Sequence, residues 1–250
     1  MALPPLRPLS LGEVLDVSFG LYRAMFSQLV LVAAAAQSIP ILVNIFIASA
    51  GGELENLGLF LASLCVSMVL NALGVAASTY IVSDAYLGRR TTAATAFGRT
   101  AGKLGLLLGI SLLSSLLIGF GLLLLIVPGV IILSGLLLGT VVGVLESQPG
   151  AIAAMGRSWE LTTGYRGKAF LTLIAVVLLL AVPWLLITTL WGLIGDAGVG
   201  SISMLVVQSL LGIFIYPLLY VVLTVLYYDL RVRKEGFDLE LLATALGPAE

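Results

Sequence analysis

Histidine is absent from this chain of 250 residues, and cysteine occurs once, at Cys65. The missing histidine removes the commonest general base and the commonest metal ligand. A single cysteine forms no intrachain disulfide and cannot build a thiolate zinc site. The sequence also contains no evident nucleophile–base pair, glycine-rich phosphate loop or metal-ligand cluster. We therefore expect a protein that is not an enzyme and has neither a cofactor nor a metal.

Charged residues are also scarce, at 10% of the chain against about 25% in an ordinary soluble domain. Hydrophobic residues make up 60%. With so few charges, most of the surface must face lipid instead of water. The net charge of −1 favours no polyanionic partner, so we expect no nucleic acid to bind.

Long runs without a charged residue indicate membrane spans, because a helix needs about 20 apolar residues to cross a hydrocarbon core of about 30 Å. Four runs hold one span each: Ala24–Gly52, Asn56–Ser83, Ala169–Gly195 and Ala197–Tyr228. The fifth run, Leu104–Leu145, would be about 63 Å long as one straight helix, about twice the core thickness.

Val127-Pro128-Gly129 interrupts this fifth run and favours a turn. We therefore expect two spans, from Leu104 to about Ile126 and from about Val130 to Leu145, joined by a tight hairpin. With six spans all 12 Lys and Arg residues lie on one side, whereas five spans divide them evenly. Because basic residues in short loops mark the cytoplasmic face, the sequence predicts six transmembrane helices and cytoplasmic N- and C-termini.

Amphipathic segments precede the first, third and fifth spans. Ser10-Leu11-Gly12-Glu13 has the capping-box pattern of a helix start. The apolar stripe that follows consists of Leu11, Val14, Leu15, Tyr22, Met25 and Phe26. A second helix can open at Pro149 and end at Gly164, with a stripe of Ile152, Met155 and Trp159. A weaker segment runs from Thr91 to Gly102. Such stripes suit helices that lie at the membrane interface.

The chain thus divides into three units, each an interfacial helix followed by a hairpin of two spans. The units are 9–83, 91–146 and 148–228, and a cytoplasmic segment, 229–250, follows them. A single fixed offset along the sequence aligns the first unit with the third. The aligned pairs are Tyr22-Arg23 with Tyr165-Arg166, Pro40 with Pro183, and Glu53 with Asp196. We infer an internal repeat whose axis runs along the membrane normal.

No Asp, Glu, Lys or Arg lies inside a predicted span, which argues against a proton-coupled pump. The polar residues within spans include Gln37, Asn44, Asn71 and Gln208. They can form hydrogen bonds between helices or line a pathway for a solute. A cavity lined by them would favour a pathway, and a solid core would favour a structural role.

Two sets of residues are candidate contact sites. The first, a cytoplasmic surface for lipid headgroups or a protein partner, consists of Glu13, Asp16, Arg23, Arg157, Glu160, Arg166, Asp229, Arg231 and Arg233. Ion pairs among these charges would clamp the interfacial helices. The second set, Gly135, Gly139 and Gly143 at four-residue spacing, permits close helix packing. It can pack span four on span three, or join two copies as a homo-oligomer.

Three stretches carry a family resemblance. Arg7–Asp16 with Tyr22-Arg23, Arg157–Gly164 after Glu146, and Tyr227–Leu241 together resemble bacterial proteins related to the membrane domain of glycerophosphoryl diester phosphodiesterase. The resemblance implies a six-span protein of the bacterial inner membrane. It transfers no catalytic residue, because this chain has no room for the catalytic barrel and lacks its histidines.

We accordingly expect a non-enzymatic integral membrane protein that acts as a scaffold, a partner subunit or a lipid-interacting module. Its expected partners are membrane lipids and a membrane or cytoplasmic protein. The alternative is a small transporter or permease for an apolar or zwitterionic solute.

Overall fold

The computed structural model describes residues 7–50, 55–194 and 200–239. Within these ranges every element is a helix, and six helices are long and apolar enough to cross a membrane, which confirms the predicted fold class at that level. The helices are α1 (Leu11–Ala24), α2 (Phe26–Ser49), α3 (Leu57–Tyr86), α4 (Ala93–Thr100), η1 (Ala101–Lys103), α5 (Leu104–Leu124), α6 (Ile126–Leu136), α7 (Gly139–Leu145), α8 (Ala151–Thr162), α9 (Arg166–Ile194) and α10 (Gly200–Glu235).

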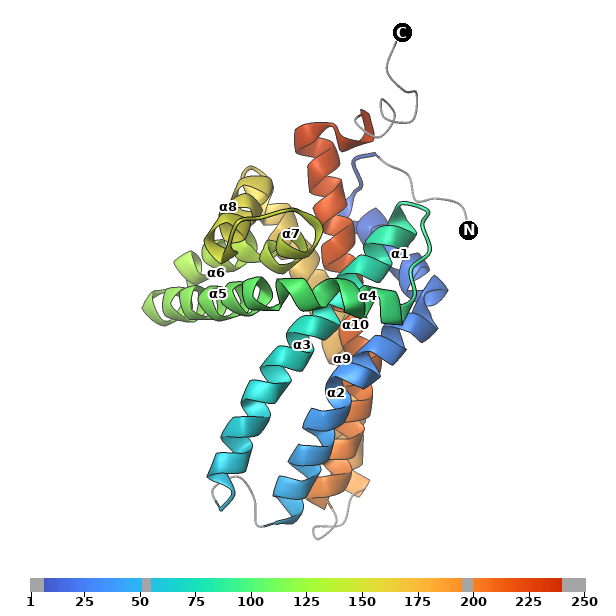
Figure 1. Ribbon diagram of the computed structural model, residues 1–250, viewed down its shortest axis with the longest axis vertical. Helices are drawn as coiled ribbons and strands as arrows, with labels where there is room; N and C mark the ends of the chain where they lie inside the picture. The colour runs from blue at the N-terminus through green and yellow to red at the C-terminus, as the bar shows by residue number, and fades with distance from the viewer. Residues whose placement is uncertain (1–6, 51–54, 195–199, 240–250) are drawn as a thin grey trace.

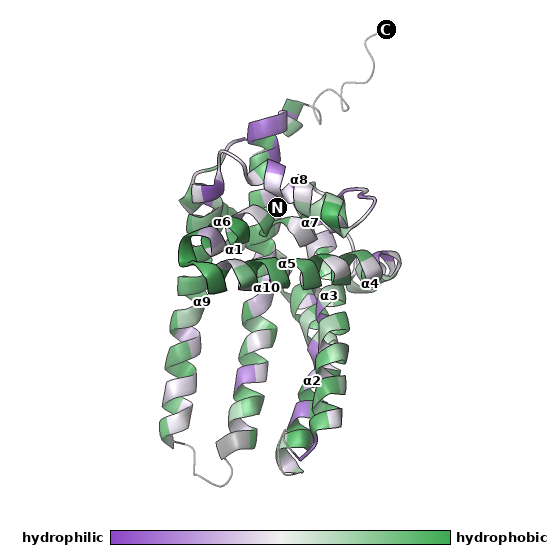
Figure 2. Cartoon of the chain, turned by 90° about the vertical axis from the view of Figure 1, so that its left-hand side faces the viewer, coloured by the Kyte–Doolittle hydropathy of each residue, from purple (hydrophilic) through white to green (hydrophobic). Residues whose placement is uncertain are grey.

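Four of the six long helices, α2, α3, α9 and α10, run along the long axis of the molecule (Figure 1). Helix α5 runs across that axis in both views, near the end where α1, α4 and α8 lie (Figures 1 and 2). Hydropathy predicts that α5 is apolar enough to span but carries no information on its direction. The direction is set by packing against α3, α6, α7 and α8.

Helix α6 folds back along α5, and the turn differs from the predicted one. Leu125, with φ −160° and ψ 145°, is the single extended residue between the two helices. Pro128 lies in the first turn of α6 instead of in the loop, where its missing N–H costs no helical hydrogen bond. The backbones cross closely, since a Cβ built on Gly121 would lie 3.1 Å from the Cα of Gly129. We call the pair Leu104–Leu136 the α5–α6 hairpin.

The predicted fourth span is broken into α6 and α7 at Leu137 and Leu138. The hydroxyl of Ser158, on α8, bridges this break: it donates to the carbonyl of Gly135 at 2.8 Å and accepts from the amide of Leu138 at 3.2 Å. An apolar environment tolerates a break only where the freed backbone groups find such partners. Ser158 therefore stabilises the interruption.

Helices α1, α4 and α8 lie where the amphipathic pattern predicts helices, and we call these three the short helices. The capping box of Ser10 and Glu13 is present at the start of α1. Helix α8 begins at Ala151, two residues after Pro149, and Gly164 follows its end with φ +87°, a conformation that favours glycine. Of the predicted apolar stripe of α8, Met155 is buried and Ile152 is 79% exposed. Ala154, Ser158 and Thr162 are buried as well, and α8 packs on α6 and α7.

The tight core lies at the end of the molecule that holds the short helices. In α3 the buried residues gather from Ala72 onward, and in α10 they gather from Leu218 to Val232. The opposite half of α3 is largely exposed and apolar, including Leu57, Leu61 and Leu64. The long helices are therefore joined firmly at one end, and apolar side chains face outward at the other.

Candidate functional site

Three acidic residues lie at the same end of the molecule. Each contacts α4, α8 or the segment before α1. They are Asp84 on α3, Glu146 directly after α7 and Asp229 on α10. We call them the anchor acids. Each accepts hydrogen bonds from a neighbouring segment, and each forms an ion pair with a basic residue.

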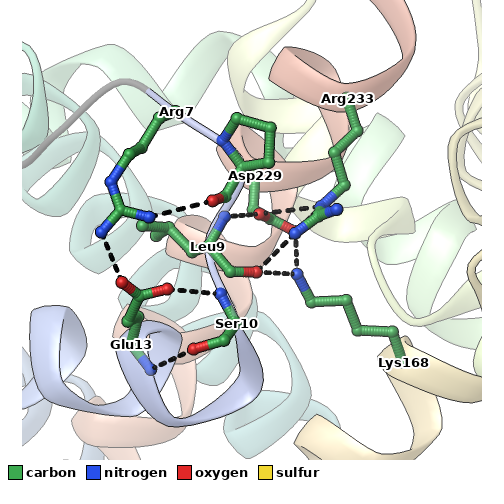
Figure 3. A network of polar contacts seen from close by, with 8 residues as sticks. Arg7, Leu9, Ser10, Glu13, Lys168, Asp229 and Arg233 are labelled. Atoms are coloured by element: carbon green, nitrogen blue, oxygen red, sulfur yellow. Dashed lines mark hydrogen bonds and ion pairs between the residues drawn. The ribbon is translucent and has the colours of Figure 1, made fainter.

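Asp229 is the most buried of the three, with no exposed surface. Its carboxylate accepts from the amide of Leu9 at 2.7 Å and from Arg233 Nε at 3.1 Å, and it pairs with Lys168 Nζ (Figure 3). The carbonyl of Leu9 accepts in turn from Lys168 Nζ at 2.6 Å and from Arg233 Nη2 at 2.5 Å. One backbone unit thus ties the segment before α1 to both α9 and α10.

Asp84 holds α4 against α3. Its carboxylate accepts from Arg99 Nη1 at 2.8 Å and from the hydroxyl of Thr91. The guanidinium of Arg99 also lies 3.9 Å from the ring centroid of Tyr80 on α3, within range of a cation–π interaction. Two different contacts therefore fix the same arginine.

Glu146 joins α8 to α10. It accepts from Arg157 Nε at 3.0 Å and from the hydroxyl of Tyr227 at 2.9 Å. Arg157 also pairs with Glu235, which accepts from Arg231 Nε at 2.9 Å. The acids and bases alternate, so the charges compensate one another along the cluster.

Lys103 closes the end of α7. Its ammonium donates to the carbonyls of Gly143 at 2.9 Å, Val144 at 2.6 Å and Glu146 at 3.1 Å. The last carbonyls of a helix have no partner within the helix and carry its negative dipole end, so a lysine is favourable there. All three donors of the ammonium are used, which joins the start of α5 to the end of α7.

The anchor acids link the three sequence units in a closed order. Asp84, which directly follows the first unit, holds α4 of the second, and Glu146 of the second holds α8 of the third. Asp229, which directly follows the third unit, bonds to the segment that begins the first. Two links join neighbours in sequence, whereas the third joins residues 220 positions apart.

Aromatic packing supports the same end of the bundle. The rings of Tyr86 on α3 and Tyr228 on α10 are stacked with centroids 4.8 Å apart. The hydroxyl of Tyr228 lies 2.7 Å from Ser83 Oγ. These contacts bring α3 and α10 together beside the anchor acids.

The residues of the predicted cytoplasmic surface differ in their placement. Asp229 is fully buried, so its place on an accessible surface is wrong. The side chains of Arg157, Arg231 and Arg233 are 20–26% exposed and lie in ion pairs. The exposed positions are Asp16, Arg23 and Glu160.

Two predicted surface residues have partners that the sequence did not indicate. Glu13 pairs with Arg7, and the hydrogen bond from Arg7 lowers the pKa of Glu13 to about 2. The guanidinium of Arg166 lies 3.9 Å from the centroid of the Trp159 ring.

Sequence reasoning missed Asp84, Glu146, Lys103 and Lys168 as contact residues. Each of them directly precedes or follows a charge-free run. That position in the sequence was the signal that could have identified them.

The glycines of the predicted fourth span face two helices of the same chain. A Cβ on Gly135 would lie 2.2 Å from the Trp159 ring of α8. A Cβ on Gly143 would lie 2.6 Å from Ile110 of α5, and one on Gly139 would lie 3.3 Å from the same residue. Packing on α5 was one of the two expectations, and α8 is an additional neighbour. This face is occupied within the chain and is not open to a second copy.

A small cavity with several polar residues in its lining lies between α2, α3 and α10. Its lining includes Gln37, Asn71, Ser78, Tyr216 and Tyr220, and its volume is about 20 Å³. That is enough for about one water molecule. Of the other polar span residues, Asn44 accepts from Ser63 Oγ at 3.2 Å, and Gln208 is not among the lining residues.

Among the described residues no group of three His, Cys, Asp or Glu is placed to hold a metal ion. Comparison with protein-family models, with curated proteins and with solved structures gives no match. The six apolar helices define a multi-pass α-helical membrane protein.

Proposed function

We propose that this chain is a non-enzymatic membrane scaffold whose short helices form a preassembled platform at the cytoplasmic face. The observation that carries the proposal is the closed order of anchor contacts. Asp84, Glu146 and Asp229 fix α4, α8 and the segment before α1 to the long helices. A platform that needs no ordering on contact binds a partner at lower entropic cost.

The proposed topology places both termini and all three short helices in the cytoplasm or at its interface. The first and last described segments lie at the same end as α1, α4 and α8, which supports it (Figure 1). The 12 Lys and Arg residues support it through the positive-inside rule. The resemblance of the terminal and α8 segments to bacterial membrane-domain proteins leads us to propose the bacterial inner membrane as its location.

The alternative function is a small permease, with the cavity between α2, α3 and α10 as part of its pathway. The hydroxyl of Tyr220 lies 3.4 Å from Asn71 Oδ1, so the polar groups in this cavity are close enough to interact with one another. A volume of about 20 Å³ is far below the 300–1,000 Å³ of ordinary ligand pockets. The cavity therefore supports a bound water and a structural role for these residues.

Two measurements test the scaffold. Purified protein in liposomes should pass glycerol and a zwitterionic amino acid no faster than empty liposomes do. Flux that disappears in Asn71→Leu would establish the permease instead. In cells, photo-cross-linking residues at Asp16 and Glu160 should give the same cross-linked protein, whereas one at lipid-facing Leu178 should not. Equal cross-linking at all three positions would contradict a platform at this face.

A further inference from the structure

The α5–α6 hairpin is unusual because its turn carries no polar side chain. From Leu116 to Leu133 every side chain is apolar or absent. The loops that join the other long-helix pairs differ: Glu53 and Glu55 lie between α2 and α3, and Asp196 lies between α9 and α10. A turn that emerged into water on that side would expose only leucine, isoleucine and valine.

The exposed surface of the hairpin is concentrated at this turn. Leu123 is 82% exposed, Ile126 74% and Phe120 62%. Solvation of these side chains by water is unfavourable by about 25 cal/mol per Å² of apolar surface, so they require an apolar covering. The hairpin is otherwise covered on one side by α8 and bordered by α3 and α9.

Two hydrogen bonds within the backbone close the turn. The amide of Leu125 donates to the carbonyl of Gly121 at 3.1 Å, and the carbonyl of Leu125 accepts from Gly129 at 3.2 Å. Pro128 has no N–H to satisfy. These features leave fewer polar groups of the turn to be satisfied by its surroundings.

The position of α5 along α3 gives its depth. Ser111 of α5 lines the same groove as Asn71 of α3. Asn71 lies about 21 Å along the helix from Leu57, at 1.5 Å per residue. If Leu57 stands at the far boundary of a core about 30 Å thick, α5 crosses α3 in the leaflet nearer the anchor acids. It does so while running across the long axis (Figures 1 and 2).

We propose that the α5–α6 hairpin lies within the cytoplasmic leaflet as a one-sided wedge, covered by acyl chains, and does not cross the membrane. The basic-residue distribution is compatible with this placement, because a hairpin that enters and returns on one side leaves every Lys and Arg where six spans would. Two such helices occupy about 500 Å² in one leaflet only, at a helix diameter of about 10 Å.

A wedge of this kind gives the protein a larger cross-section at its cytoplasmic face. The membrane around it relaxes by curving so that the cytoplasmic leaflet is convex. The inference goes beyond the scaffold role: it assigns the protein a preference for curved membrane, with a lipid monolayer as the partner of this surface.

Depth measurements in Cys65→Ala protein test the proposal. A nitroxide attached to Leu123→Cys should relax faster with oxygen than with a water-soluble nickel complex, as Leu178→Cys on α9 does. A nickel chelate carried on lipid headgroups should relax it more from the cytoplasmic leaflet than from the other. The matched control Glu55→Cys should react with an impermeant maleimide from the far side.

Reaction of Leu123→Cys from the same side as Glu55→Cys would overturn the wedge, because the hairpin would then cross. Low accessibility to both oxygen and nickel would overturn it too, since the turn would then be packed on a second copy of the chain. Neither outcome affects the scaffold, whereas solute flux would reject the scaffold and leave the depth of Leu123 unchanged.

Curvature preference is measured with the protein reconstituted in both orientations into vesicles of graded diameter. The fraction of molecules with the cytoplasmic face outward should rise as the diameter falls. An equal fraction at every diameter would refute a curvature preference.

Discussion

Replacing Asp229 by asparagine is expected to weaken the attachment of the N-terminal segment to α9 and α10. The carboxylate has no exposed surface and faces two cations, Lys168 and Arg233, whose side chains are only 17% and 23% exposed. Removing the acid from such a group leaves the bases uncompensated, which typically costs 3–5 kcal/mol. Asparagine keeps one acceptor for the amide of Leu9, so we expect a loss of about 2–4 kcal/mol.

The free energy of unfolding can be measured in mixed micelles by titrating a denaturing detergent and following tryptophan fluorescence. Asp16→Asn is the matched control, because Asp16 is an exposed acid on α1 and its replacement should not move the transition. The double variant Asp229→Asn, Lys168→Met should recover part of the loss, since it removes one unpaired charge and keeps Arg233 as a donor to the carbonyl of Leu9. A transition of Asp229→Asn that coincides with wild type would refute the anchoring role.

Three further outcomes follow from individual contacts. Gly135→Ala should destabilise the protein by about 1–3 kcal/mol, because the added Cβ would overlap the tryptophan ring of α8. The control Gly119→Ala should be neutral or stabilising, because nothing lies within 4 Å of its added Cβ. Equal melting temperatures for the two variants would contradict the close packing. Lys103→Met should cost about 1–3 kcal/mol by leaving three carbonyls at the end of α7 without a donor, which amide hydrogen exchange in α7 can check. The pair with Arg7 lowers the pKa of Glu13 from its ordinary value of 4.5 to about 2. The stabilisation from the ionised carboxylate is therefore complete above pH 4.5 and is lost as the pH falls through about 2. An NMR titration of this carboxyl with its midpoint near 4.5 would show that the pair with Arg7 does not form.

Much of the fold could be predicted because it depends on composition and period. The charge-free runs predict the long helices, since apolar length alone decides whether a helix can span. The capping box at Ser10 and the glycine after α8 predict local ends, because both act within a few residues. The turn at Leu125 could not be placed from Pro128, since proline is as acceptable in the first turn of a helix as in a loop.

The candidate site was predicted only in part, because ion pairing depends on which helix ends meet. Asp229 and Arg233 are four residues apart on one helix, so their contact was available from the sequence. Lys168 is 61 positions from Asp229, and nothing in the local pattern indicates that α9 and α10 bring them together. The role of Ser158 on α8 was missed for a related reason: its hydroxyl bonds to a break in the neighbouring helix that only the fold reveals.

The sequence by itself determined that the chain is helical and rich in membrane-spanning segments, and which side of them carries the basic residues. These properties follow from hydrophobic length and charge placement, which are linear. Tertiary structure alone decided the direction of the α5–α6 hairpin, the depth of Asp229 and the closed order of the anchor acids. Each of these depends on contacts between residues far apart in the chain, and an apolar helix has no local feature that distinguishes lying across a leaflet from crossing it.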